Sequence, residues 1–177
     1  MQVYIALLRG INVGGHKKIK MAELRNILEN NGLQEVQTYI QSGNIVFKSE
    51  EKPAQLAHNI HHLIKENFGF LVPVLVVSKD ELGNIMENTP FDTESEENQL
   101  FFSLLKSEPG NTQVQAFKML EFPNEAFHFT PNCVYLNFVG SYRNAKLNNN
   151  FIENKLKVEA TTRNLKTMQK LLDMSKA

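Results

Sequence analysis

Hydrophobic periodicity in the first half of the chain predicts four strands and two helices. The predicted strands are residues 3–8, 36–41, 45–47 and 72–77. Apolar positions at helical spacing predict one helix from Met21 to Leu28 and a second that opens at Pro53. The segment Ser42-Gly43-Asn44 is typical of a tight hairpin turn. The order strand, helix, strand, strand, helix, strand is that of a ferredoxin-like α/β plait.

The second half repeats this order. Strands are predicted at residues 99–106, 125–130, 133–139 and 158–161, and helices around residues 114–120 and 151–156. A further helix follows each plait. The first is marked by the capping box that Ser78 and Glu81 form, and the second by Thr162 as the N-cap. The predicted fold class is therefore α+β, with two tandem ferredoxin-like α/β plaits (βαββαβ), each followed by an extra helix.

A polar break divides the two predicted plaits. Residues 88–98 contain Pro90 and four acids, which is typical of a linker or a long loop. We expect an N-terminal plait over residues 1–90, carrying the glycine-rich loop and the hairpin, and a C-terminal plait over residues 91–177. A chain of 177 residues is long enough for two small domains.

Composition narrows the classes of function. The formal net charge is zero, whereas dedicated nucleic-acid binders usually carry a basic excess. A single cysteine excludes an intrachain disulfide and a cysteine metal cluster. The first apolar run is too short for a signal-peptide core or a membrane span, and no later run is long enough for a span. We expect a cytoplasmic bacterial protein without a membrane contact.

The loop after the first strand carries the strongest local signal. It runs from Arg9 through Gly14 and Gly15 to Lys20, and no acidic residue occurs before Glu23. The following helix starts without a serine, threonine, aspartate or asparagine at its expected cap. Its unpaired N–H groups and positive dipole end would favour an anion. The loop is thus a positive patch on a neutral chain, and it predicts an anion site.

Plait connectivity brings a second segment to this loop. The first and second strands end at the same edge of the sheet, so the Arg9–Lys20 loop should touch the Gln41–Asn44 hairpin. The expected ligand-binding residues are Arg9, Asn12, Gly14, Gly15, Lys18, Lys20, Gln41, Ser42, Gly43, Asn44 and Arg163. The structural alternative is that the glycines only turn the chain, the hairpin residues only form their turn, and Asn12 holds the edge together.

Arg163 has two interpretations. It lies in Thr161-Thr162-Arg163-Asn164, where a strand end, a helix cap and a solvent-facing arginine account for the residues. Alternatively, Arg163 faces the first plait and completes a cleft between the two domains.

Three other motifs give weaker evidence of a functional site. The stretch Gly10–Gly15 has the glycine spacing of a P-loop, but His16 stands where the lysine is required. His58 and His62 are four residues apart on a helix and are expected to face solvent, without a third metal ligand. Cys133 is expected to be buried rather than nucleophilic. We therefore assign no catalytic residue, no metal site and no cofactor from the sequence.

Four motifs together resemble one bacterial family. They are Tyr4–Gly15, Lys20–Arg25, Thr38–Asn44 and Ala160–Asn164. The chain resembles the family known as domain of unknown function 1697 over nearly its whole length. The resemblance implies a pair of ferredoxin-like plaits and implies no activity. Leu165 stands where the family would have a tryptophan, a position that we expect to serve packing.

The expected function is the binding of a small anionic ligand, phosphorylated or carboxylated, at the edge shared by the loop and the hairpin. Three alternatives stay open: an enzyme with a site between the domains, a nucleic-acid binder that uses the basic loop, and a protein-interaction module. The sequence leaves open whether the protein is an enzyme and what its oligomeric state is.

Overall fold

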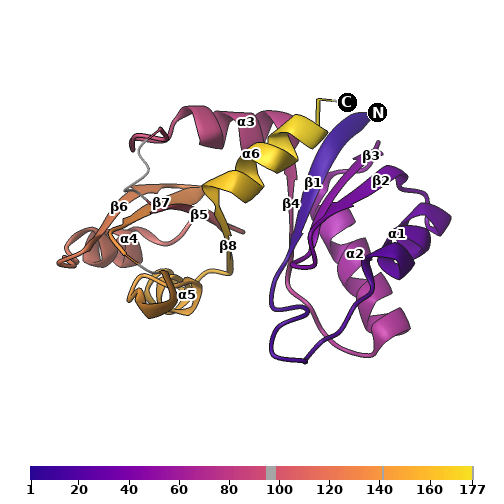
Figure 1. Ribbon diagram of the computed structural model, residues 1–177, viewed down its shortest axis with the longest axis horizontal. Coiled ribbons are helices and arrows are strands. Elements are labelled where there is room, and N and C mark those ends of the chain that lie inside the picture. The colour runs from indigo at the N-terminus through magenta and orange to yellow at the C-terminus, as the bar shows by residue number, and fades with distance from the viewer. Residues whose placement is uncertain (95–98, 141, 177) are drawn as a thin grey trace. The chain divides into compact units, whose positions relative to one another are not determined.

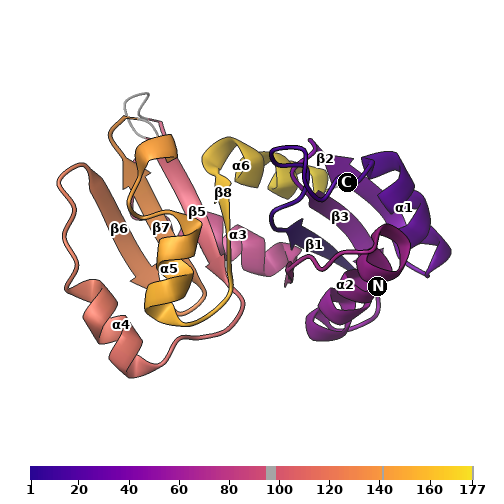
Figure 2. The same ribbon diagram turned by 90° about the horizontal axis from the view of Figure 1, so that it is seen from below.

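Residues 1–94, 99–140 and 142–176 are described by a computed structural model, and they form two four-stranded antiparallel sheets (Figure 1). The first sheet has the strand order β2-β3-β1-β4. Its strands are β1 (Gln2–Leu8), β2 (Gln34–Tyr39), β3 (Asn44–Ser49) and β4 (Val74–Ser78). The helices α1 (Met21–Asn30) and α2 (Pro53–Phe68) cover one face of this sheet, as Figures 1 and 2 show.

The second sheet has the corresponding order β6-β7-β5-β8. Its elements are β5 (Gln99–Leu105), α4 (Asn111–Lys118), β6 (Glu125–Thr130), β7 (Cys133–Phe138), a 3-10 turn η1 (Tyr142–Asn144), α5 (Asn149–Leu156) and β8 (Ala160–Asn164). Both sheets thus have the topology of an α/β plait, and the predicted fold class is confirmed.

The two extra helices are α3 (Lys79–Glu87) and α6 (Leu165–Met174). The chain divides into two compact units, one formed by Met1–Asn84 with the segment from Lys170 onward, and one by Ile85–Gln169. The boundary expected between residues 90 and 91 remains a prediction. Glu96 and Glu97, part of the expected linker, lie outside the described residues.

One hydrophobic cluster stabilises the first plait. Alternate residues of β1, including Tyr4, Ala6 and Leu8, pack with the apolar faces of α1 and α2. Leu24 and Ile60 represent those faces, and both are buried. Every second residue of β1 and the apolar stripes of the two helices therefore share one core. Leu8, the last residue of β1, belongs to this core, and the loop begins directly after it.

The cap of α6 differs from the prediction. Thr162 is not the N-cap, because β8 continues to Asn164, which pairs with Phe101 of β5. The side-chain Oδ1 of Asn164 accepts a hydrogen bond of 2.9 Å from the backbone N–H of Thr167. Extending the strand ladder moves the helix start past the threonine, and asparagine is among the preferred caps. The capping box of α3 is confirmed, with both reciprocal bonds between Ser78 and Glu81.

Candidate anion site at the loop and hairpin edge

The loop from Arg9 to Lys20 is built on left-handed backbone. Gly10, Asn12, Gly14, Gly15 and Lys17 all have positive φ angles. Glycine adopts this conformation without steric strain, and asparagine tolerates it better than most residues. The turn at the tip is closed by the N–H of His16, which donates to the carbonyl of Val13 at 3.0 Å. The glycines are therefore needed for the path of the chain, whatever binds to it.

Asn12 fastens the loop to the hairpin. Its Nδ2 donates to the carbonyl oxygen of Gln41 at 2.8 Å and to that of Ile19 at 3.0 Å. Its Oδ1 accepts from the N–H of Ile19 at 2.8 Å. The contact expected between the loop and the hairpin is thus confirmed, although the two segments are far apart in sequence. The side-chain amide of Asn12 therefore holds the edge together through Ile19 and Gln41, and its contact with a ligand remains a prediction.

The residues of the hairpin also hold the edge together. Asn44 is fully buried, and its Nδ2 donates to Tyr39 O at 3.1 Å and to Ser42 Oγ at 2.9 Å. The carbonyl of Gly43 accepts a 2.8 Å bond from the N–H of Leu8. These contacts close the turn between β2 and β3 and attach it to the end of β1. Ser42, Gly43 and Asn44 therefore position the edge.

A third segment, residues 69–73, meets the same edge and was not anticipated from the sequence. Lys17 Nζ donates to the carbonyl of Leu71 at 2.7 Å. The N–H of Arg9 donates to the carbonyl of Pro73 at 3.1 Å. No sequence signal identifies which carbonyl a lysine will reach. The plait order alone could have placed this segment nearby, because it leads into β4, the neighbour of β1.

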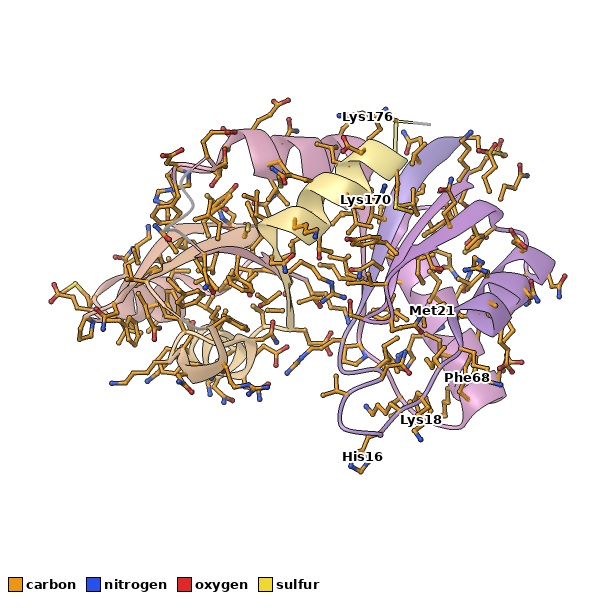
Figure 3. All side chains as sticks on the ribbon, in the orientation of Figure 1. His16, Lys18, Met21, Phe68, Lys170 and Lys176 are labelled. Atoms are coloured by element: carbon orange, nitrogen blue, oxygen red, sulfur yellow. The ribbon has the colours of Figure 1, made fainter. Side chains whose placement is uncertain are left out.

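The cations of the edge differ in exposure. Lys18 and Lys20 are exposed, whereas Arg9 is half-buried. His16 is also exposed and projects from the tip of the loop, with Lys18 farther along it (Figure 3). None of the segments 9–20, 38–44 and 69–74 contains an acidic residue. The edge therefore has a positive potential that no carboxylate in these segments offsets.

The start of α1 has no side-chain cap, as expected, and Lys20 occupies the cap position. Two other helices share this feature: Lys52 at the cap position of α2 and Gly110 at that of α4 also give no side-chain cap. Glu50 and Glu51 precede α2, however, whereas the approach to α1 contains only cations and neutral residues. Inside the helices the order is reversed, because the first turn of α1 contains Glu23 and that of α2 contains no acid. The property that distinguishes α1 is thus the charge of the chain that leads to it.

Arg163 lies on β8, in the second unit, opposite Phe102 of β5. It is half-buried rather than solvent-facing, and its Nη1 donates to Thr162 O at 3.0 Å. Desolvation of the guanidinium lowers the pKa of Arg163 to about 10. Its participation in a cleft with the first plait remains a prediction.

A polar cluster in the second plait also escaped the sequence interpretation. Thr162 Oγ1 lies 3.1 Å from Ser103 Oγ and 2.8 Å from Asn149 Oδ1. The Nδ2 of Asn149 is buried without a hydrogen-bond partner among the described residues. Burial raises the pKa of Tyr142, and its bonds to Asn149 and Thr162 oppose that shift. These residues come from β5, η1, α5 and β8, so no local motif could have revealed the cluster.

An open groove of about 600 Å³ runs beside the edge strand β6. Its lining includes Lys118, Phe122, Phe127 and His128. None of the expected ligand-binding residues contributes to it. The groove is therefore separate from the expected anion site.

The two histidines four residues apart lie at the surface of α2. His58 and His62 lie together on α2 with ring centroids 5.0 Å apart, and both are exposed. Within the described residues, no group of three histidine, cysteine, aspartate or glutamate side chains is placed to hold a metal ion. The same part of the chain contains no helix with both the length and the apolar character of a membrane span.

Cys133 is expected to resist thiol reagents in the folded protein. It is fully buried at the start of β7, and burial raises the pKa of its thiol far above the usual range. The reactive form is the thiolate, so both access and ionisation oppose reaction. Reaction with a chromogenic disulfide at neutral pH should be slow in buffer and fast in denaturant. Equal rates under the two conditions would contradict this environment.

The sheets and their covering helices define a tandem α/β-plait protein. The chain belongs to the DUF1697 family of proteins of unknown function, whose family model matches residues 1–135. It is similar in structure to the conserved bacterial protein SP0830 from Streptococcus pneumoniae, with a TM-score of 0.79 and 29% identity over 98% of each chain. No curated protein matches the chain. The resemblance seen in the sequence is confirmed, and the family leaves the activity open.

Proposed function

We propose that the loop and hairpin edge of the first plait binds a small anionic ligand, phosphorylated or carboxylated. The observation that carries the proposal is the pair of exposed lysines, Lys18 and Lys20, at the end of the acid-free loop that leads to the uncapped start of α1. Backbone N–H groups at a helix start and nearby ammonium groups are both attracted to an anion.

In this proposal some of the predicted residues attract the anion and the others hold the backbone around it. Lys18 and Lys20 supply charge, and Arg9 adds a longer-range attraction. Asn12, Gln41, Ser42, Gly43 and Asn44 hold the backbone in place, and Gly14 and Gly15 shape the tip of the loop. An ammonium group acts as a point charge rather than a planar fork, so the site would select an anion mainly by charge. We assign no reaction to it.

Reversing both exposed charges tests the proposal. The variant Lys18→Glu/Lys20→Glu should fold normally, because exposed substitutions usually change stability by less than about 0.5 kcal/mol. For the wild-type protein, an anion at ten times its Kd should stabilise the fold by about 1.4 kcal/mol, or about 3–6 °C in Tm. The double variant should lose this shift. Thermal unfolding with inorganic phosphate, citrate, nucleotides and sugar phosphates measures it.

The matched control reverses two lysines elsewhere in the same unit. Lys52→Glu/Lys65→Glu changes the net charge by the same amount, and both side chains are exposed. Lys52 also occupies the cap position of an uncapped helix. This control should keep the anion-induced shift. If both double variants lose it equally, the effect is one of overall charge and the proposed site is wrong.

A further inference from the structure

The same edge also exposes aliphatic side chains. Val13, Ile40 and Leu71 are 66%, 50% and 54% exposed. They make up half of the large hydrophobic side chains that are exposed in the described residues, the others being Met1, Met119 and Val139. Isolated apolar residues on a surface are ordinary, but these three come from separate segments that meet at one edge.

Hydrogen bonds bring the three segments together. The 2.8 Å bond from Asn12 to Gln41 joins the chain neighbours of Val13 and Ile40. The 2.7 Å bond from Lys17 to the carbonyl of Leu71 brings in the third segment. The aliphatic side chains therefore occur on a hydrogen-bonded framework that also carries the exposed lysines.

Ile40 has an unfavourable backbone conformation for its residue type. Its φ angle is 49°, in the left-handed region, which costs a β-branched residue about 1–2 kcal/mol. Glycine or asparagine would avoid much of this cost, and the exposed isoleucine side chain adds little to the core. A contact with a partner would give this side chain a use that the isolated fold does not provide.

We infer that this edge docks a protein segment that carries both acidic and aliphatic side chains. The inference rests on the proposed function, since the carboxylates of the segment would be the anions that Lys18 and Lys20 attract. Charge complementarity points to acids, because the three segments of the edge contain cations and no carboxylate. The aliphatic side chains of the partner would cover Val13, Ile40 and Leu71.

Other large partners fit the edge less well. Anionic membranes are typically bound by clusters of four to eight basic residues, often with aromatic anchors. Here Lys17 is held by the carbonyl of Leu71, Arg9 is half-buried, and the exposed apolar side chains are aliphatic. Single-stranded nucleic acids are bound by exposed aromatic stacking platforms, whereas the aromatic residues of these segments, Tyr39 and Phe70, are half-buried.

Fluorescence anisotropy with three labelled peptides tests the inference. The first peptide alternates glutamate and leucine, the second glutamate and serine, and the third lysine and leucine. The glutamate–leucine peptide should bind the wild-type protein at least tenfold more tightly than either of the others. The variant Val13→Ser/Leu71→Ser should reduce this binding about tenfold, to the level of the glutamate–serine peptide. The control Met119→Ser/Val139→Ser, which alters two side chains that are more exposed than Val13 and Leu71, should leave it unchanged.

The outcomes separate this inference from the proposed function. If both glutamate peptides bind equally and depend on Lys18 and Lys20, the aliphatic contact is wrong and the anion site stands. If the glutamate–leucine peptide binds Lys18→Glu/Lys20→Glu as tightly as the wild type, its carboxylates do not bind at these lysines and the docking inference is wrong. The anion-induced shift in Tm then decides the proposed function separately. If phosphatidylserine vesicles or a single-stranded RNA bind through this edge and no peptide does, a protein segment is not the partner.

Discussion

Replacing Gly43 by alanine is expected to destabilise the first plait by about 2–4 kcal/mol, from backbone strain together with overpacking. Gly43 has a φ angle of 84°, and an added Cβ would lie 2.5 Å from the Cβ of Leu8. Leu8 is fully buried, and its contact atom lies next to the backbone, so it cannot move aside easily. The clash would separate the hairpin from the end of β1.

Gly10→Ala is the matched control for Gly43. Gly10 has a similar φ angle of 72°, and an added Cβ would meet no atom within 4 Å. The Gly10→Ala variant should therefore lose only about 1–2 kcal/mol of unfolding free energy, from the strain of alanine in a left-handed conformation. Urea unfolding followed by circular dichroism gives both free energies of unfolding. If the two variants lose the same amount, Gly43 does not pack against Leu8 as described.

Replacing Asn12 by alanine is expected to cost about 2–3 kcal/mol, because three hydrogen bonds of about 1 kcal/mol each are removed. Both donated bonds and the accepted bond of the amide are lost, and alanine is disfavoured at the φ angle of 55°. Asn12→Gly should cost less, because glycine accepts the backbone conformation while losing the same bonds.

Asn12→Asp keeps the shape of the side chain but removes its two donated hydrogen bonds. The carboxylate can still accept from the N–H of Ile19, but its second oxygen would face the carbonyl oxygens of Ile19 and Gln41. The aspartate should therefore be at least as destabilising as the alanine. Amide hydrogen exchange in β1 and β3 measures the loss of stability near the loop. Exchange should be faster in Asn12→Asp and in Asn12→Ala than in the wild type. An alanine variant as stable as the wild type would exclude the fastening role of Asn12.

The fold could be predicted because its elements are specified locally. Residues 3–8 form a continuous apolar run that marks β1, the helices show apolar stripes, and Ser78 with Glu81 marks the start of α3. Once the plait order was known, the meeting of the loop and the hairpin followed from connectivity. The cap at Asn164 could not be predicted, because it depends on how far β8 pairs with β5.

The candidate site could be predicted only in part. The positive charge and the uncapped start of α1 are visible in the sequence, and the structure confirms the missing side-chain cap. The fastening contacts of Asn12 and Lys17 depend on which carbonyls lie within reach. Val13 and Leu71 resemble ordinary apolar residues until folding places their segments on one edge. Sequence patterns thus predict where the edge is, and only geometry separates its framework from its exposed surface.

A titration followed by two-dimensional amide NMR locates the anion site residue by residue. Inorganic phosphate is added to the isotope-labelled protein, and the chemical shifts of all amides are followed. An anion bound at the loop and hairpin edge should give saturable shifts concentrated at residues 18–23, around the start of α1, with little change at residues 50–56, around the start of α2. Saturable shifts concentrated anywhere else, or the absence of any saturable response, would contradict an anion site at the loop and hairpin edge.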